Sequence, residues 1–295
     1  MDFEECLLSL SELEIENLGD IDLFKENLDL YIDQMIDFLG LDDEIRSITI
    51  LPGTDKLGSP EGFDHIKIRK AQVVSIVGPT GSGKSRLLGD IEWVASGDTP
   101  TNRTILINDK KPDLKWRFSA NNKLVAQLSQ NMNFVMDLNV EDFLRLHAKS
   151  RMVENPEEVI AKIIEIANDL SGEQFDRKSS ITTLSGGQSR ALMISDTAIL
   201  SKSPIILIDE IENAGVDRKK ALDLLVSENK IVLIATHDPT LALMADKRII
   251  IKNGAILKII NTSEEEKKVL VELEKMDKVI NDMRANLRKG ELLSI

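Results

Sequence analysis

Cysteine and long apolar runs are scarce in this sequence. Its 295 residues include one cysteine, Cys6, which excludes an internal disulfide framework and a cysteine-rich zinc site. No apolar run approaches the roughly 18 residues that a membrane span needs, so we expect no membrane-spanning subunit. The opening MDFEECLLSL has no basic residue ahead of its apolar ones. We therefore expect no cleaved secretory signal and a chain that stays in the cytosol.

An excess of positive charge is also lacking. The chain carries 37 basic and 50 acidic residues, a net charge of −13. Residues 1–44 hold fifteen of the acidic residues and one basic residue, Lys25, so that segment alone has a net charge of −14 and the rest of the chain is nearly neutral. A nucleic-acid partner, which would need a basic face, is therefore not expected.

Three segments with different patterns follow one another. Residues 1–44 mix apolar residues and carboxylates at helical spacing, which predicts an acidic helical extension that either packs on the body or docks a partner. Residues 45–262 are predicted to form one domain of the α/β class. Residues 263–295 begin with a possible capping box, Ser263 and Glu266, and continue as an amphipathic C-terminal helix. This helix either packs on its own domain or pairs with a second copy.

Short runs rich in β-branched residues recur in the central domain: ITIL, AQVVSIV, TILI, PIILIDE, KIVLIAT and RIIIKNG. Continuous apolar strands that alternate with helical stretches predict a mostly parallel sheet. Between Asn133 and Thr183 helical patterns replace the strand pattern, so we expect a helical subdomain inserted at about residues 131–186.

Residues 78–85 fit the sequence pattern of a phosphate-binding loop. They also follow a predicted strand and precede a helical stretch, which is the position that such a loop requires. Glycines let successive backbone N–H groups turn around a β-phosphate, and the helix N-terminus adds partial positive charge. Lys84 is predicted to reach the β- and γ-phosphates, and Ser85 to bind Mg²⁺. The candidate nucleotide-binding residues of the loop are Gly78, Pro79, Thr80, Gly81, Ser82, Gly83, Lys84 and Ser85.

Two carboxylates end the apolar strand predicted at residues 204–210. In a phosphate-loop ATPase the first, Asp209, holds Mg²⁺ through water, and the second, Glu210, polarises the attacking water. Together with the phosphate loop, this pair predicts hydrolysis of a nucleoside triphosphate.

The segment Leu184-Ser185-Gly186-Gly187-Gln188 is the signature of the ATP-binding cassette (ABC) superfamily, which the sequence resembles from about Ile48 to Thr262. Three further positions match the family in order. Gln130 resembles the Q-loop glutamine, Asp217 the D-loop aspartate and His237 the switch histidine. The resemblance implies a P-loop NTPase core that binds and hydrolyses ATP with Mg²⁺.

The resemblance also implies a shared site. In this family two cassettes face each other head to tail, and each ATP lies between the phosphate loop of one and the signature of the other. Ser185 and the amides of Gly186 and Gly187 would donate to the γ-phosphate. Gln188 and Asp217 are also predicted to be nucleotide-binding residues, on the same side of the shared site as the signature.

The remaining roles implied by the resemblance concern the γ-phosphate. Glu210 would be the general base, and His237 would orient the γ-phosphate and the water. Gln130 would bind Mg²⁺ with Ser85 and Asp209, and would couple the nucleotide to the helical subdomain.

The sequence departs from the family pattern at three places. Residues 51–57, where an aromatic residue usually stacks on adenine, contain none. The stretch from Asp209 to Asp217 is one residue longer than usual, and Asp196 stands where an arginine is common. Residues 170–174, Leu-Ser-Gly-Glu-Gln, imitate the signature without its second glycine, and we interpret them as a decoy.

Two functions are consistent with these motifs. The first is the ATP-binding subunit of an ABC transporter, paired with a second cassette, either another copy or a homologous chain, and with a separate membrane permease. The second is a cytosolic ABC ATPase that remodels or activates a cytosolic protein or a cofactor enzyme. Both imply a cytoplasmic chain, and the first adds peripheral attachment to the inner face of the membrane.

Overall fold

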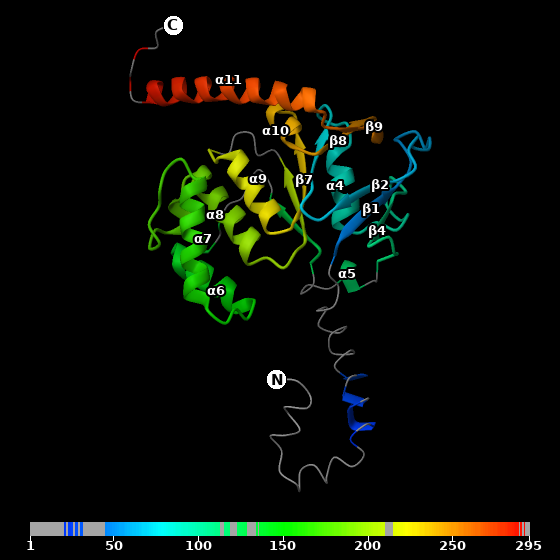
Figure 1. Ribbon diagram of the computed structural model, residues 1–295, viewed down its shortest axis with the longest axis horizontal. Helices are drawn as coiled ribbons and strands as arrows, with labels where there is room; N and C mark the ends of the chain where they lie inside the picture. The colour runs from blue at the N-terminus through cyan, green and yellow to red at the C-terminus, as the bar shows by residue number, and fades with distance from the viewer. Residues whose placement is uncertain are drawn as a thin grey trace. The chain divides into compact units, whose positions relative to one another are not determined.

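The computed structural model describes residues 45–112, 115–118, 123–128, 134, 136–209, 215–288, 290 and 292, and residues 21, 23–25, 27, 28, 30 and 31. The chain divides into two units, residues 1–44 and residues 45–295. In the first unit the described residues between 21 and 31 are helical. The second unit contains the two sheets and the helices labelled in Figure 1.

The central sheet has six strands in the order β5-β6-β7-β3-β8-β9. These are β3 (Val73–Val77), β5 (Val125–Leu128), β6 (Ile205–Asp209), β7 (Ile231–Thr236), β8 (Lys247–Lys252) and β9 (Ala255–Asn261). Four of the neighbouring pairs are parallel, and the β8 and β9 pair is antiparallel. The predicted α/β fold with a mostly parallel sheet is thus confirmed.

A second sheet consists of three antiparallel strands in the order β2-β1-β4. They are β1 (Ser47–Leu51), β2 (Ile66–Arg69) and β4 (Thr104–Ile107). The apolar runs at β1 and β4 were expected in the parallel sheet, and that expectation is wrong. Four of the five residues of β1 are buried, and burial on both faces makes a strand apolar whichever way its neighbours run.

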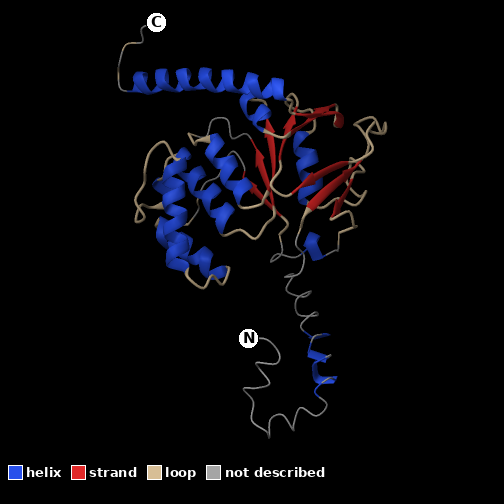
Figure 2. Cartoon of the chain, viewed as in Figure 1, coloured by secondary structure: helices blue, strands red, loops and turns tan. Residues whose placement is uncertain are grey.

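Helices cover both faces of the central sheet (Figure 2). One core lies between the sheet and α6 (Val140–Ser150), α7 (Pro156–Leu170), α8 (Gly186–Ile199) and α9 (Arg218–Ser227). The other core contains α4 (Lys84–Glu92) and the three-stranded sheet. Along β6, Ile206 and Ile208 belong to the first core, while Ile205 and Leu207 belong to the second. Because side chains alternate along a strand, α8 and α4 lie on opposite faces of the central sheet.

Short elements complete the body: α5 (Lys115–Phe118), a 3-10 helix (Ile181–Thr183) and α10 (Pro239–Met244). The helices predicted between Asn133 and Thr183 are present as α6 and α7.

The C-terminal helix, α11 (Glu264–Arg288), begins with the predicted capping box. Ser263 N donates to Glu266 Oε2 at 3.1 Å, and Glu266 N donates to Ser263 Oγ at 3.2 Å. On its inner face, Thr240 Oγ1 of α10 donates to Asp277 Oδ2 at 3.2 Å. The helix thus packs on its own domain, although seven of its apolar residues are exposed: Val269, Val271, Met276, Val279, Ile280, Met283 and Leu287. No helix within the described residues is long and apolar enough to cross a membrane.

Candidate nucleotide site

The candidate catalytic groups meet at the carboxyl edge of the central sheet. Val77, the last residue of β3, pairs with Thr236 at the end of β7. Asp209, the last residue of β6, pairs with Ala235. The loops that follow parallel strands leave the sheet at one edge. The phosphate loop, Asp209 and His237 are therefore neighbours at this edge.

The phosphate loop packs tightly against the end of β8 and the turn that follows it. A β-carbon on Gly83, whose φ is +115°, would approach Gly254 Cα to 2.8 Å. A β-carbon on Gly78 would approach the carbonyl oxygen of Ile251 to 2.5 Å. Glycine is required at both positions because of this close approach, and Gly83 also needs it for its backbone conformation. Helix α4 then begins at Lys84.

Three groups suited to binding an anion belong to the phosphate loop and the start of α4. The buried hydroxyl of Ser82 has no hydrogen-bond partner among the described residues. The N-terminus of α4 has no side-chain cap. Lys84 Nζ donates to the carbonyl oxygens of Gly78 at 2.6 Å and Pro79 at 3.3 Å. An orphaned hydroxyl, a cation and a helix N-terminus together fit the phosphates of a nucleotide.

The oxygen groups beside the loop fit Mg²⁺. Ser85 is exposed in the first turn of α4, and Asp209 is half-buried at the end of β6. Within the described residues, no group of three or more His, Cys, Asp or Glu side chains is placed to hold a metal ion. Mg²⁺ does not need one, because it usually keeps waters and phosphate oxygens alongside one or two protein ligands. Gln130 and Glu210 lie outside the described residues, so their roles stay predictions.

The signature begins α8 with a complete capping box. Ser185 Oγ accepts from Gln188 N at 3.3 Å, and Ser185 N donates to Gln188 Oε1 at 2.8 Å. Gln188 Nε2 donates to the carbonyl oxygens of Glu173 at 3.3 Å and Gln174 at 3.2 Å. The segment interpreted as a decoy therefore supports the signature. The side-chain amide of Gln188, expected at the nucleotide, is bonded to protein groups, while Ser185 and Gly186 are exposed.

Asp217 caps α9, since its Oδ1 accepts from Lys220 N at 3.1 Å. The next residue, Arg218, donates from Nη1 to Asp238 Oδ2 at 3.0 Å. Asp238 follows His237 and caps α10. An ion pair thus links the segment of Asp217 to that of His237. The sequence analysis missed this pair, although Asp238 before Pro239 is an N-cap signal.

Asp196, the departure from the family pattern in α8, is buried and has a partner in α6. Its Oδ1 lies 2.8 Å and its Oδ2 2.9 Å from Nδ1 of His147. This contact joins the signature helix to the helical subdomain and pairs a carboxylate that would otherwise be buried alone. His147, which matches no motif, therefore has a structural role.

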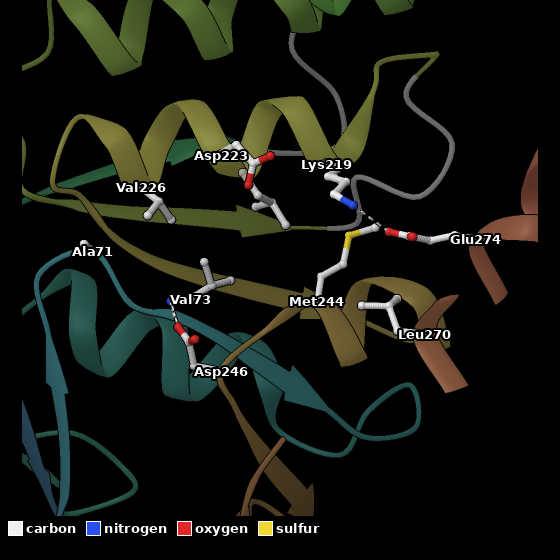
Figure 3. Close-up of a pocket in the computed structure, with 10 residues that line it drawn as sticks. Ala71, Val73, Lys219, Asp223, Val226, Met244, Asp246, Leu270 and Glu274 are labelled. Atoms are coloured by element: carbon white, nitrogen blue, oxygen red, sulfur yellow. Dashed lines mark hydrogen bonds and ion pairs between the residues drawn. The ribbon is translucent and has the colours of Figure 1, made fainter. Parts of the chain in front are cut away.

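A pocket of about 280 Å³ lies elsewhere, between the start of β3, α9, α10 and α11 (Figure 3). Asp246 Oδ2 accepts from Val73 N at 2.9 Å at one wall, and Lys219 pairs with Glu274 at 3.3 Å at the other. Val73 is the first residue of β3, whereas the phosphate loop follows its last residue. The pocket is therefore at the opposite edge of the sheet from the candidate nucleotide site.

Comparison with known proteins shows the family of this chain. The family model described as ABC transporter matches residues 64–213. An uncharacterized ABC transporter ATP-binding protein of Methanocaldococcus jannaschii is 49% identical over 251 residues, which cover 85% of this chain and 96% of that protein.

Solved structures support the fold. CbiO1 from Clostridium perfringens, part of the ABC transporter complex cbiONQ, matches with a TM-score of 0.55 and 23% identity, over 83% of this chain and 96% of its own. A dimeric ATP-binding cassette in a post-hydrolysis state bound to ADP and Pi matches with a TM-score of 0.52 and 22% identity, over 73% of this chain and 99% of its own. The chain belongs to the family of ABC transporter ATP-binding proteins and is an ATP hydrolase.

Proposed function

We propose that this chain is the ATP-binding subunit of an ABC transporter and that it works as a pair. Each ATP, with Mg²⁺, is held between the phosphate loop of one copy and the signature of the other. The position of α4 and α8 on opposite faces of the central sheet is the observation that carries this proposal. Ser185 and Gly186 are exposed, so the Ser185 hydroxyl and the Gly186 amide can serve a nucleotide bound by another molecule.

The phosphate loop is proposed to bind the phosphates of ATP. Ser82, Lys84 and the loop amides hold the β- and γ-phosphates through charge-assisted hydrogen bonds. Ser85 and Asp209 would hold Mg²⁺, which neutralises charge on the phosphate oxygens. Gln130 would complete this set of ligands.

In the reaction step, a water oxygen attacks the γ-phosphorus in line with the bond to the bridging oxygen of ADP. Glu210 accepts the proton of this water, and His237 orients the γ-phosphate. The bond to the bridging oxygen breaks, leaving ADP and inorganic phosphate. Donors of the signature in the second copy stabilise charge on the γ-phosphate, so hydrolysis requires the pair.

The proposed partner is a separate membrane permease. The relatives are transporter ATP-binding proteins, and no described helix of this chain can cross a membrane. The net charge of −14 in residues 1–44 favours a second candidate, a cytosolic ABC ATPase that remodels a protein partner. Affinity purification from the native cell separates the two. A polytopic membrane protein captured at equal stoichiometry supports the transporter, whereas purely cytosolic partners support the second candidate.

The shared site is tested with Glu210→Gln, which keeps the binding groups but removes the base. We expect this variant to form a dimer with MgATP, to remain a monomer with MgADP, and to lose at least about a hundredfold in hydrolysis rate. Light scattering coupled to size exclusion measures the first two outcomes. Glu212→Gln, two residues further on, is the matched control and should hydrolyse ATP normally. A Glu210→Gln protein that binds MgATP and stays monomeric refutes the shared site.

A further inference from the structure

The segment without the expected aromatic residue has a defined structure beside the phosphate loop. We call residues 52–61, which follow β1, the Lys56 loop. Asp55 Oδ1 accepts from the backbone N–H groups of Leu57 and Ser59, each at 2.8 Å. Asp55 O also accepts from Gly58 N at 3.1 Å. These bonds close a tight turn in which Lys56 is exposed.

Lys56 connects this turn to the phosphate loop. Its backbone N–H donates to Asn253 O at 3.1 Å, in the turn between β8 and β9. Gly254 N in the same turn donates to Ser82 O at 2.6 Å. The Lys56 side chain crosses Gly254, where an added β-carbon would come within 2.9 Å of Lys56 Cγ. At its end, Lys56 Nζ donates to Gly81 O at 2.9 Å.

A buried ion cluster holds these parts in place. Arg103 bonds to Glu61 through Nε at 3.0 Å and Nη2 at 2.5 Å, and to Asp90 Oδ2 through Nη1 at 3.0 Å. Glu61 belongs to the Lys56 loop and also accepts from Gly53 N at 2.8 Å. Asp90 belongs to α4, and Arg103 Nη2 also donates to Gly254 O at 2.7 Å. The cluster thus fixes the Lys56 loop and the β8 to β9 turn relative to the phosphate-loop helix.

No described residue balances the charge of Lys56. Among the described residues it pairs with no carboxylate, and its ammonium group bonds to one carbonyl oxygen. An ammonium group has three N–H donors, so two remain available. A cation held over the mouth of a phosphate loop with free donors suits phosphate oxygens, and it has no feature that recognises a base.

We propose that Lys56 binds the phosphates of the nucleotide and replaces base stacking in this site, so that the protein accepts adenine and guanine nucleotides about equally. This inference rests on the proposed function, because it assumes that the phosphate loop holds the nucleotide.

The experiment is isothermal titration calorimetry of the full chain with MgADP and with MgGDP, which are not hydrolysed. The wild-type affinities for the two nucleotides should agree within about threefold. Lys56→Ala should weaken both by about tenfold, the value of one charge-assisted hydrogen bond. Lys56→Arg, which keeps the charge, should retain most of the affinity. The loss should shrink in high salt, because ions screen an exposed charge.

The matched control is Lys278→Ala, which removes the same charge from the exposed face of α11 and should change neither affinity. The inference is overturned if Lys56→Ala binds both nucleotides as wild type does, or if it weakens MgADP alone, which would indicate a contact with the base. A wild-type preference for MgADP of about a hundredfold would also overturn it. By contrast, failure of the wild type to bind either nucleotide, or unaltered binding by Lys84→Ala, would refute the phosphate-loop site itself.

Discussion

Replacing Arg103 by methionine is the sharpest test of the buried ion cluster. The Arg103 and Glu61 side chains are 0% exposed and that of Asp90 is 3% exposed. Burial by itself would lower the pKa of Arg103, but hydrogen bonds and charge from Glu61 and Asp90 outweigh burial and raise the pKa above its usual value. Arg103→Met leaves both carboxylates in the core without their cation and removes a donor from Gly254 O.

The expected loss is large because water cannot reach the orphaned carboxylates. Removing one partner of a buried ion pair typically lowers the free energy of unfolding by about 3 to 5 kcal/mol. In a domain of this size, that corresponds to a fall in melting temperature of roughly 10 °C. Urea unfolding followed by circular dichroism, without nucleotide, measures the change. Arg103→Lys keeps the charge but loses the bidentate bond to Glu61. Its loss in the free energy of unfolding should therefore be smaller than that of Arg103→Met.

Arg145 provides the control. It also contacts three carboxylates, those of Glu141, Asp142 and Glu157, but its side chain is 43% exposed. Solvent screens such surface pairs, so Arg145→Met should lose only a small fraction of what Arg103→Met loses. Equal losses in the two variants, or wild-type stability of Arg103→Met, would refute the reasoning from burial.

Two further predictions concern single side chains. Burial lowers the pKa of Lys230, whose Nζ donates to the carbonyl oxygens of Ser201 at 2.7 Å and Ser203 at 3.1 Å. At pH values between that lowered pKa and 10.5, Lys230 binds its proton more tightly in the unfolded chain than in the folded one. The free energy of unfolding of the wild type, relative to that of Lys230→Met, should therefore rise as the pH increases through this window. Urea unfolding at about pH 8 and about pH 10 measures this, and a constant difference would contradict it. Ser185→Ala removes the hydroxyl that accepts from Gln188 N, an N-cap worth about 1 kcal/mol of stability. Because the same hydroxyl is proposed to contact the nucleotide of the second copy, the variant should also weaken ATP-induced dimerisation. Its MgADP affinity should match the wild type, and calorimetry that found a parallel loss would assign Ser185 a purely structural role.

Much of the fold and of the candidate site could be predicted from local sequence patterns. The phosphate loop, Asp209 and His237 were each identified from a short motif next to an apolar strand, and the strand register brings them to one edge. The capping box at Ser263 was also predictable, because its partners are three residues apart. Such features depend on neighbours in the chain, so their residue types and spacing are sufficient.

The direction and pairing of the strands were harder to predict from the sequence. The strand β2, with its alternating Ile66-Lys67-Ile68-Arg69, was missed, and β1 and β4 were expected in the wrong sheet. An apolar run reports that a strand is buried, whereas its direction depends on which distant segment pairs with it.

The sequence by itself determined that this chain binds a nucleoside triphosphate and belongs to the ABC family, because the phosphate loop and the signature are continuous segments that a reader of the sequence can identify. The tertiary structure alone decided how that site is supported. Arg103, Glu61 and Asp90 match no motif, and Lys56 stands out only as the neighbour of a missing aromatic residue. Their ion pairs and hydrogen bonds join residues up to 197 positions apart in the chain, as the bond from Lys56 N to Asn253 O does. Contacts between such distant residues depend on how the sheets and helices pack, which residue spacing does not encode.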